Sequence, residues 1–267
     1  MSLLDERFPE RRIAVDGGVV SYRTCGTGPA IVLLHGIGSG AASWLPCALR
    51  MAHEAQVIAW NAPGYGSSSP LANALPRAAD YAARLHQLLT TLDIKRCVLV
   101  GHSLGAIMAS AYTAAHGESV SKLVLLSPAQ GYGSAARRAQ GQQVAQDRLA
   151  ALENMGVSGM AEHRSGRMLS PQASDAARAW VRWNMQQLDP AGYTQAVHML
   201  CGDAIQNYAP VGVTGAVYCG GADAITTPQD SRALATQFAL PFALIDEAGH
   251  ACYVEQPDAV AAAIRQD

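Results

Sequence analysis

The sequence lacks the features that mark membrane, secreted and metal-binding proteins. Its 267 residues contain no run of about 18 apolar residues, which excludes a membrane-spanning helix. The opening MSLLDERFPERR is charged and has no apolar segment of a secretory signal. The cysteines form no CxxC pair and no close metal-ligand spacing, so we predict no metal site. We expect a cytoplasmic protein whose cysteines are reduced core residues: Cys25, Cys47, Cys97, Cys201, Cys219 and Cys252.

An excess of charge of either sign is also missing. The chain has 19 Lys and Arg residues against 21 Asp and Glu residues, for a formal net charge of −2. Nothing in that balance favours nucleic acid or an anionic membrane as a partner. Because 49% of the residues are hydrophobic and only 15% are charged, the chain can bury a sizeable core. Its length allows one large domain, or one domain with an insertion.

The most informative stretch reads CVLVGHSLGAIMASAYTAA and begins at Cys97. An apolar run leads into GHSLG and then into a segment of small residues with helical character, which predicts a strand, a tight turn and a helix. Ser103 lies at the tip of the turn, where a strained backbone leaves no room for side chains two residues away, so Gly101 and Gly105 let the turn close. The N–H of Leu104 begins the helix and points toward whatever Ser103 attacks.

A second glycine-rich loop, HGIGSG at residues 35–40, follows a wholly apolar run. Such a loop could hold a phosphate, but its spacing is not GxGxxG and no GK[ST] follows. Near a nucleophilic serine the loop has a better explanation, because a backbone N–H there can supply a second donor to an oxyanion. We predict Ile37 as that donor. His35 is interpreted as a structural residue that fixes the loop, since one base suffices for this chemistry.

Short apolar runs alternate with helical segments along much of the chain, which is typical of a doubly wound parallel sheet in the α/β class. The expected strands are 30–34, 56–60, 97–100, 122–126, 215–219 and 241–245, preceded by an antiparallel hairpin of 11–16 and 19–25. Expected helices outside the region discussed next are 43–52, 77–92, 229–239 and 257–264, besides the helix after GHSLG.

The alternation of strand-like and helical segments stops between residues 129 and 209, where no strand-like run occurs. This part predicts a helical cap inserted into an α/β core formed by residues 1–128 and 210–267. Its expected helices are 135–152, 157–169, 174–188 and 193–204. The aromatic and basic residues of the cap allow two interpretations. They form an ordinary solvated face, or an arginine and a tryptophan, with Arg164 and Trp183 as candidates, face a pocket and hold an anionic or aromatic substrate.

A serine, an aspartate and a histidine each come directly after a predicted strand, in that chain order. All three side chains would project from the same edge of a parallel sheet. A serine hydroxyl needs a base to take its proton, and the base needs a carboxylate to fix its tautomer. We assign Ser103 as nucleophile, His250 as general base and acid, and Asp223 as the orienting carboxylate. The competing carboxylates are Asp203, Asp246 and Glu247.

Together these motifs resemble the α/β-hydrolase superfamily over nearly the whole chain outside the cap. The residues that carry the resemblance are HGIG at 35–38, NAPGYGSS at 61–68, GHSLG at 101–105, GGADAITTP at 220–228 and AGHACYVEQPDAV at 248–260. The resemblance implies a mostly parallel eight-stranded sheet flanked by helices, an acyl-enzyme on Ser103, and an oxyanion hole from the N–H groups of Ile37 and Leu104. Asn61 stands where many relatives carry an aspartate, at a position that is normally structural.

Within the superfamily the chain is similar to bacterial esterases, enol-lactonases and hydrolases of aromatic degradation. We expect a serine hydrolase that cleaves a small carboxylic ester or lactone without a cofactor. The alternatives are a carbon–carbon bond hydrolase of ring-cleavage products with the same triad, and a ligand-binding protein that has lost turnover. We expect a small-molecule substrate and a monomer or homodimer. Candidate substrate contacts are His102, Arg164, Trp183 and Tyr253.

Overall fold

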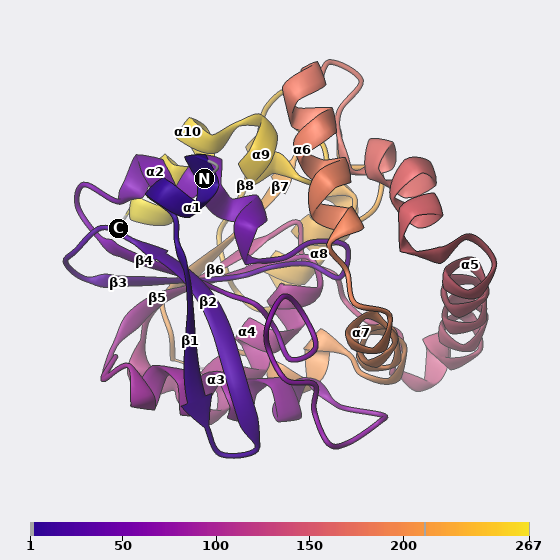
Figure 1. Ribbon diagram of the computed structural model, residues 1–267, viewed down its shortest axis with the longest axis horizontal. Helices are drawn as coiled ribbons and strands as arrows, with labels where there is room; N and C mark the ends of the chain where they lie inside the picture. Colours follow the sequence, from indigo (N-terminus) through magenta and orange to yellow (C-terminus); the bar gives the residue numbers. More distant parts are fainter. Residues whose placement is uncertain (1–2, 211, 267) are drawn as a thin grey trace.

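A computed structural model describes residues 3–210 and 212–266 and contains one eight-stranded sheet with the strand order β1-β2-β4-β3-β5-β6-β7-β8 (Figure 1). β2 pairs antiparallel with both β1 and β4, and the remaining pairs are parallel. The strands are β1 (Glu10–Val15), β2 (Gly18–Cys25), β3 (Ala30–Leu34), β4 (Gln56–Trp60), β5 (Cys97–His102), β6 (Val120–Leu126), β7 (Gly215–Gly220) and β8 (Phe242–Ile245). The expected mostly parallel sheet of eight strands is confirmed.

Helices cover both faces of the sheet, with α2 and α10 in contact on one face and α3 and α4 in contact on the other (Figure 1). Outside the cap the helices are α1 (Leu3–Arg7), α2 (Leu45–Met51), α3 (Ala78–Thr91), α4 (Leu104–Ala115), α8 (Pro228–Gln237), α9 (Cys252–Glu255) and α10 (Pro257–Arg265). The apolar spacing in α3 buries Tyr81, Leu85 and Leu88, as expected for an amphipathic helix. No helix in the described ranges is long and apolar enough to cross a membrane.

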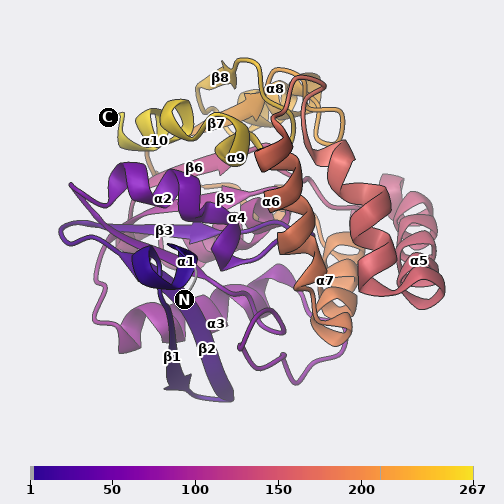
Figure 2. The same cartoon turned by 45° about the horizontal axis from the view of Figure 1, so that its top comes forward.

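Between β6 and β7 the described residues form helices and no strand of the sheet. The helices are α5 (Arg138–Arg164), α6 (Asp175–Gln186) and α7 (Pro190–Gly202), and α5 is broken at Gly156, where φ is 62°. That break lies where the sequence predicts a boundary between two helices. Figure 2 shows α5, α6 and α7 side by side beyond one end of the sheet. The cap limits of 129 and 209 stay a prediction.

The strand order places β3 between β4 and β5. The chain therefore passes from β3 to β4 on one side and later returns to form β5 on the other side of β3. A crevice forms outside the carboxyl ends of parallel strands at such a reversal, and ligands bind there in open α/β sheets. The register aligns these ends, with Leu34 of β3 opposite Gly101 of β5 and His102 of β5 opposite Leu126 of β6. The glycine loop and the GHSLG turn therefore meet at this crevice.

His35 fixes the loop after β3. It is buried, its Nδ1–H donates to the Gly36 carbonyl at 2.9 Å, and its Nε2 accepts from the Ala62 N–H at 3.1 Å. Burial lowers the pKa of His35 to about 4, against a smaller opposite effect of the Gly36 hydrogen bond. Beside it, Asn61 accepts from the Ala41 N–H at 2.9 Å, as expected for a structural residue. The neutral imidazole thus joins two loops near the crevice.

We predict that His35→Gln lowers stability at pH 7.5 by about 1–3 kcal/mol, because two buried hydrogen bonds are lost or weakened. The folded pKa of about 4 lies below the unfolded value of 6.5, so protonation of this imidazole favours unfolding as pH falls from about 6.5 toward 4. Wild-type stability should therefore fall more steeply between pH 7 and 5 than that of the variant in urea titrations. His53→Gln, at an exposed histidine, is the control. Equal slopes for wild type and His35→Gln would contradict this account.

Candidate active site

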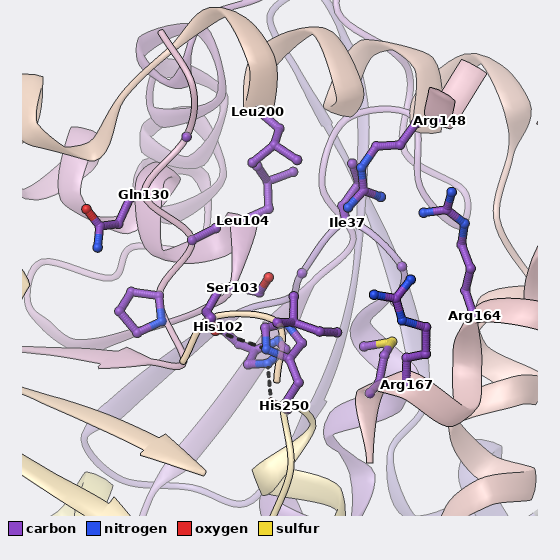
Figure 3. Close-up of a pocket in the computed structure, with 18 of the residues that line it drawn as sticks. Ile37, His102, Ser103, Leu104, Gln130, Arg148, Arg164, Arg167, Leu200 and His250 are labelled. Atoms are coloured by element: carbon purple, nitrogen blue, oxygen red, sulfur yellow. Dashed lines mark hydrogen bonds between the residues drawn. The ribbon is translucent and has the colours of Figure 1, made fainter. Parts of the chain in front are cut away.

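Ser103 is held in a strained backbone conformation at the tip of the turn between β5 and α4, with φ 53° and ψ −117°. A positive φ costs free energy in a residue other than glycine, and such strain is found at functional sites. The turn can close because the backbone of Gly105 approaches Gly101 closely. A Cβ added at Gly101 would lie 2.5 Å from the Gly105 carbonyl oxygen. Ser103 is largely buried, and it lines the pocket at this crevice (Figure 3).

His250 and Asp223 form a buried pair on the loops after β8 and β7. The Nδ1–H of His250 donates to Oδ2 of Asp223 at 2.9 Å, and both side chains are almost fully buried. The second carboxylate oxygen of Asp223 accepts from the N–H groups of Ile225 and Thr226 at 2.8 and 3.0 Å. Burial alone would raise the pKa of Asp223, but the hydrogen bond and charge of His250 and the Ile225 N–H outweigh it and lower that pKa. The carboxylate is therefore ionised beside the imidazole.

Thr226 completes this pair, and its role was missed in the sequence although it belongs to the GGADAITTP motif. Its hydroxyl lies 2.9 Å from Oδ2 of Asp223, 3.1 Å from Nδ1 of His250 and 2.9 Å from the Ser127 carbonyl oxygen. The hydroxyl has one proton to donate to the Asp223 carboxylate or to the Ser127 carbonyl, and its oxygen can accept from the His250 Nδ1–H, so it contacts both members of the pair. Only a structure shows that the side chain turns toward the pair.

The competing carboxylates are engaged or directed elsewhere. Asp203 accepts from the Ala78 N–H at 2.9 Å and from the Tyr208 hydroxyl at 2.8 Å, so it joins the end of α7 to the start of α3. Asp246 and Glu247 are exposed after β8. Among the three rivals, none makes the contact with His250 that Asp223 makes.

The backbone groups predicted as oxyanion donors lie on the same pocket as Ser103 (Figure 3). Leu104 is the first residue of α4, so its N–H has no acceptor within the helix. Ile37 lies on the loop after β3, and its carbonyl accepts from the Tyr65 hydroxyl at 2.9 Å, which restrains the loop. The two positions come from adjacent strands.

His102 lies behind the nucleophile as a neutral, buried ring. Its Nε2 is 2.8 Å from the His250 carbonyl oxygen, and because a carbonyl only accepts, the proton resides on Nε2. Burial and the neighbouring His250 lower the pKa of His102 to about 3. Its Nδ1 is buried, with no hydrogen-bond partner in the part of the chain that the structure describes. His102 borders the pocket and links β5 to the His250 loop.

The pocket above Ser103 has a volume of about 460 Å³ and is bounded by the sheet edge below and by cap side chains above (Figure 3). Apolar cap residues on its wall are Met160, Met168, Met185, Leu188 and Leu200. Four cap arginines also line it: Arg137, Arg148, Arg164 and Arg167. The prediction of Arg164 as a pocket residue agrees with this placement, whereas Arg148 was not singled out in the sequence. Among the described residues, no group of three or more His, Cys, Asp and Glu is arranged to hold a metal ion.

Two predicted substrate contacts are corrected by the structure, because neither lies on the wall of this pocket within the described ranges. Trp183 is 37% exposed and stacks on Trp180 at 5.1 Å between ring centroids, on the outer side of α6. Tyr253 is buried, stacks on Trp44 at 4.1 Å and donates to the Ser43 hydroxyl at 3.1 Å. One ring is therefore a surface residue and the other a core residue.

Comparisons with known proteins identify the family of the chain. An uncharacterized protein of Mycobacterium tuberculosis (strain ATCC 25618 / H37Rv) is 38% identical over 111 residues, and this match covers 40% of the chain and 31% of that curated relative's length. An esterase from Thermogutta terrifontis is similar in structure, with a TM-score of 0.82, 22% identity and coverage of 96% of each chain. The enol-lactonase from Burkholderia xenovorans LB400 has a TM-score of 0.83 and 22% identity, covering 94% of this chain and 97% of its own. The family model described as the alpha/beta hydrolase family matches residues 31–263, so the chain belongs to that family.

Proposed function

We propose that this protein is a serine hydrolase that cleaves a small carboxylic ester or lactone through an acyl-enzyme. The observation that carries the proposal is the convergence of three groups on one pocket. The strained Ser103 turn, the His250 ring paired with Asp223, and the first N–H of α4 meet at the carboxyl edge of the sheet. The structural similarity to an esterase and an enol-lactonase supports the same class of reaction.

In this mechanism the Ser103 hydroxyl oxygen attacks the substrate carbonyl carbon while Nε2 of His250 takes the hydroxyl proton. The Asp223 carboxylate stabilises the imidazolium that forms, because it lies 2.9 Å from Nδ1. The N–H groups of Ile37 and Leu104 donate to the tetrahedral oxyanion. Collapse of the tetrahedral intermediate breaks the bond between the carbonyl carbon and the alkoxy oxygen of the ester, and His250 gives its proton to the leaving alkoxide. Water then repeats the sequence on the acyl-enzyme, releasing the acid and restoring Ser103.

Removal of the nucleophile should abolish turnover without unfolding the protein. We predict that Ser103→Ala lowers kcat on p-nitrophenyl acetate or butyrate by roughly 10³- to 10⁶-fold and leaves cooperative thermal unfolding in place. Ser110→Ala is the matched control, because Ser110 is buried on α4 and its hydroxyl has no partner within the described residues. An active Ser103→Ala enzyme would exclude the mechanism. A wild-type enzyme that no ester acylates and no fluorophosphonate phosphonylates would favour a ligand-binding protein instead.

The carboxylate assignment is tested by a second pair of variants. We predict that Asp223→Asn lowers kcat by about 10³- to 10⁴-fold, because the amide no longer stabilises the imidazolium and can hold the wrong imidazole tautomer. Asp246→Asn should leave kcat within about twofold, since Asp246 is exposed and does not contact His250. Steady-state kinetics on one ester compares the two. A larger loss in Asp246→Asn than in Asp223→Asn would show that the acid is misassigned.

A second candidate function is hydrolysis of a carbon–carbon bond in a ring-cleavage product. The observation that favours it is the group of cap arginines on the pocket wall, which suits a substrate with more than one carboxylate. The same serine, histidine and aspartate would serve this reaction. Turnover of a vinylogous diketone from aromatic ring fission, with no turnover of p-nitrophenyl esters, would decide for this alternative. The reverse result would decide for the ester or lactone hydrolase.

A further inference from the structure

Three arginines of the cap gather their guanidinium groups on one side of the pocket. Arg148 lies within α5, Arg164 ends that helix, and Arg167 follows on the 3₁₀ turn Ser165–Met168. Figure 3 shows the three heads close together on the side of the pocket opposite Gln130, with the Ser103 hydroxyl between the two sides. Side chains from separate turns of the chain therefore bring three positive charges to one part of the wall.

These charges have no acidic partner in the pocket wall beside them. No ion pair within the described residues involves Arg148, Arg164 or Arg167. Arg148 contacts a neutral group instead, since its guanidinium donates to the Tyr193 hydroxyl at 3.2 Å. On α6, by contrast, Arg182 pairs with Glu162 at 3.4 Å outside the pocket. The cap thus pairs an arginine outside the pocket and leaves the three that line it, of which Arg167 is exposed, without an ion pair among the described residues.

Two acidic residues of this region, Asp147 and Asp230, form no ion pair with the three arginines. Asp147 is exposed on α5 and accepts from the Gln143 amide at 2.8 Å. Asp230 also lines the pocket, where its backbone carbonyl accepts from the Gln130 amide at 3.0 Å and its carboxylate accepts from the Thr227 hydroxyl at 2.8 Å. Burial and then the charge of Arg148 lower the pKa of Arg164, which agrees with close like charges.

We propose that the three arginines form a subsite for an oxyanion at the end of the substrate remote from the scissile carbonyl. Like charges held together raise the free energy of the empty pocket, and an anion between them removes that cost. Guanidinium groups suit carboxylate and phosphate because their N–H donors match two oxygens at once. Resting on the proposed function, this identifies the substrate class as an anionic ester or lactone, in the simplest case derived from a dicarboxylic acid.

The kinetic test compares two esters that differ only in the remote group. Monoethyl glutarate carries a carboxylate where ethyl pentanoate carries a methyl group, and a pH-stat follows both. We expect wild-type kcat/KM to favour the anionic ester by at least about tenfold. Arg164→Gln and Arg167→Gln should each lower kcat/KM about ten- to a hundredfold more for the anionic ester than for the neutral ester, mainly through KM of the anionic ester. Arg182→Gln should change neither ester.

A binding measurement tests the subsite without turnover. Glutarate, its neutral diamide and inorganic phosphate are added to wild type, Arg164→Gln and Arg182→Gln at matched ionic strength, and Tm is recorded. We expect glutarate or phosphate, but not the diamide, to raise Tm of wild type and Arg182→Gln and to have little effect on Arg164→Gln. The larger shift identifies the oxyanion as carboxylate or phosphate.

The two proposals fail in different ways. Equal kcat/KM on both esters in wild type, or equal losses in Arg164→Gln and Arg182→Gln, overturns the anionic subsite while Ser103-dependent turnover of ethyl pentanoate upholds the hydrolase. A Tm shift by glutarate that Arg164→Gln leaves unchanged also overturns the subsite. Absence of turnover on every ester, together with an unlabelled Ser103 after fluorophosphonate treatment, overturns the hydrolase instead.

Discussion

The approach of α4 to the end of β3 is the constraint on which the rest of the site depends. At Gly105 an added Cβ would lie 2.5 Å from the Leu34 carbonyl oxygen and 2.8 Å from that of His35. Only glycine permits this contact, and it brings the start of α4 against the loop that carries Ile37. The strain at Ser103 is retained because the strand before it and the helix after it are both buried in the core. The nucleophile and the proposed oxyanion donors are therefore set by one packing contact.

A second network joins the loop that carries His250 to the cap. Glu255 accepts from the N–H of Gly249 at 2.8 Å and from the Ser170 hydroxyl at 2.6 Å. The Ala251 N–H donates to the Met168 carbonyl at 2.7 Å. These bonds fasten the turn that carries Arg167 to the residues on either side of His250. The proposed anion subsite and the proposed base are thus held by one set of hydrogen bonds.

The sequence was enough to predict the sheet and the order of the serine, aspartate and histidine, because strand burial and turn glycines are local properties of the chain. Strand limits agree closely, as for residues 30–34 and 56–60. Cap side chains could not be oriented from sequence, since helix rotation depends on contacts between distant segments. Trp183 and Tyr253 illustrate this: their residue types suit a pocket, but one faces outward from α6 and the other stacks on Trp44. For the same reason, the sequence did not reveal the contacts of Thr226 or the place of Arg148 on the pocket wall.

The central claim is that Ser103 carries the acyl group during turnover. Intact-mass spectrometry after rapid acid quenching of the enzyme with an excess of p-nitrophenyl butyrate tests it most directly, followed by peptide mapping of any adduct. The account predicts one butyryl group per chain on the peptide that contains Ser103, appearing within the first turnover and disappearing when the ester is exhausted. Turnover that proceeds with the acyl adduct on another residue would contradict the account. So would an unmodified Ser103 peptide during turnover of an ester whose acyl-enzyme deacylates slowly enough to be trapped.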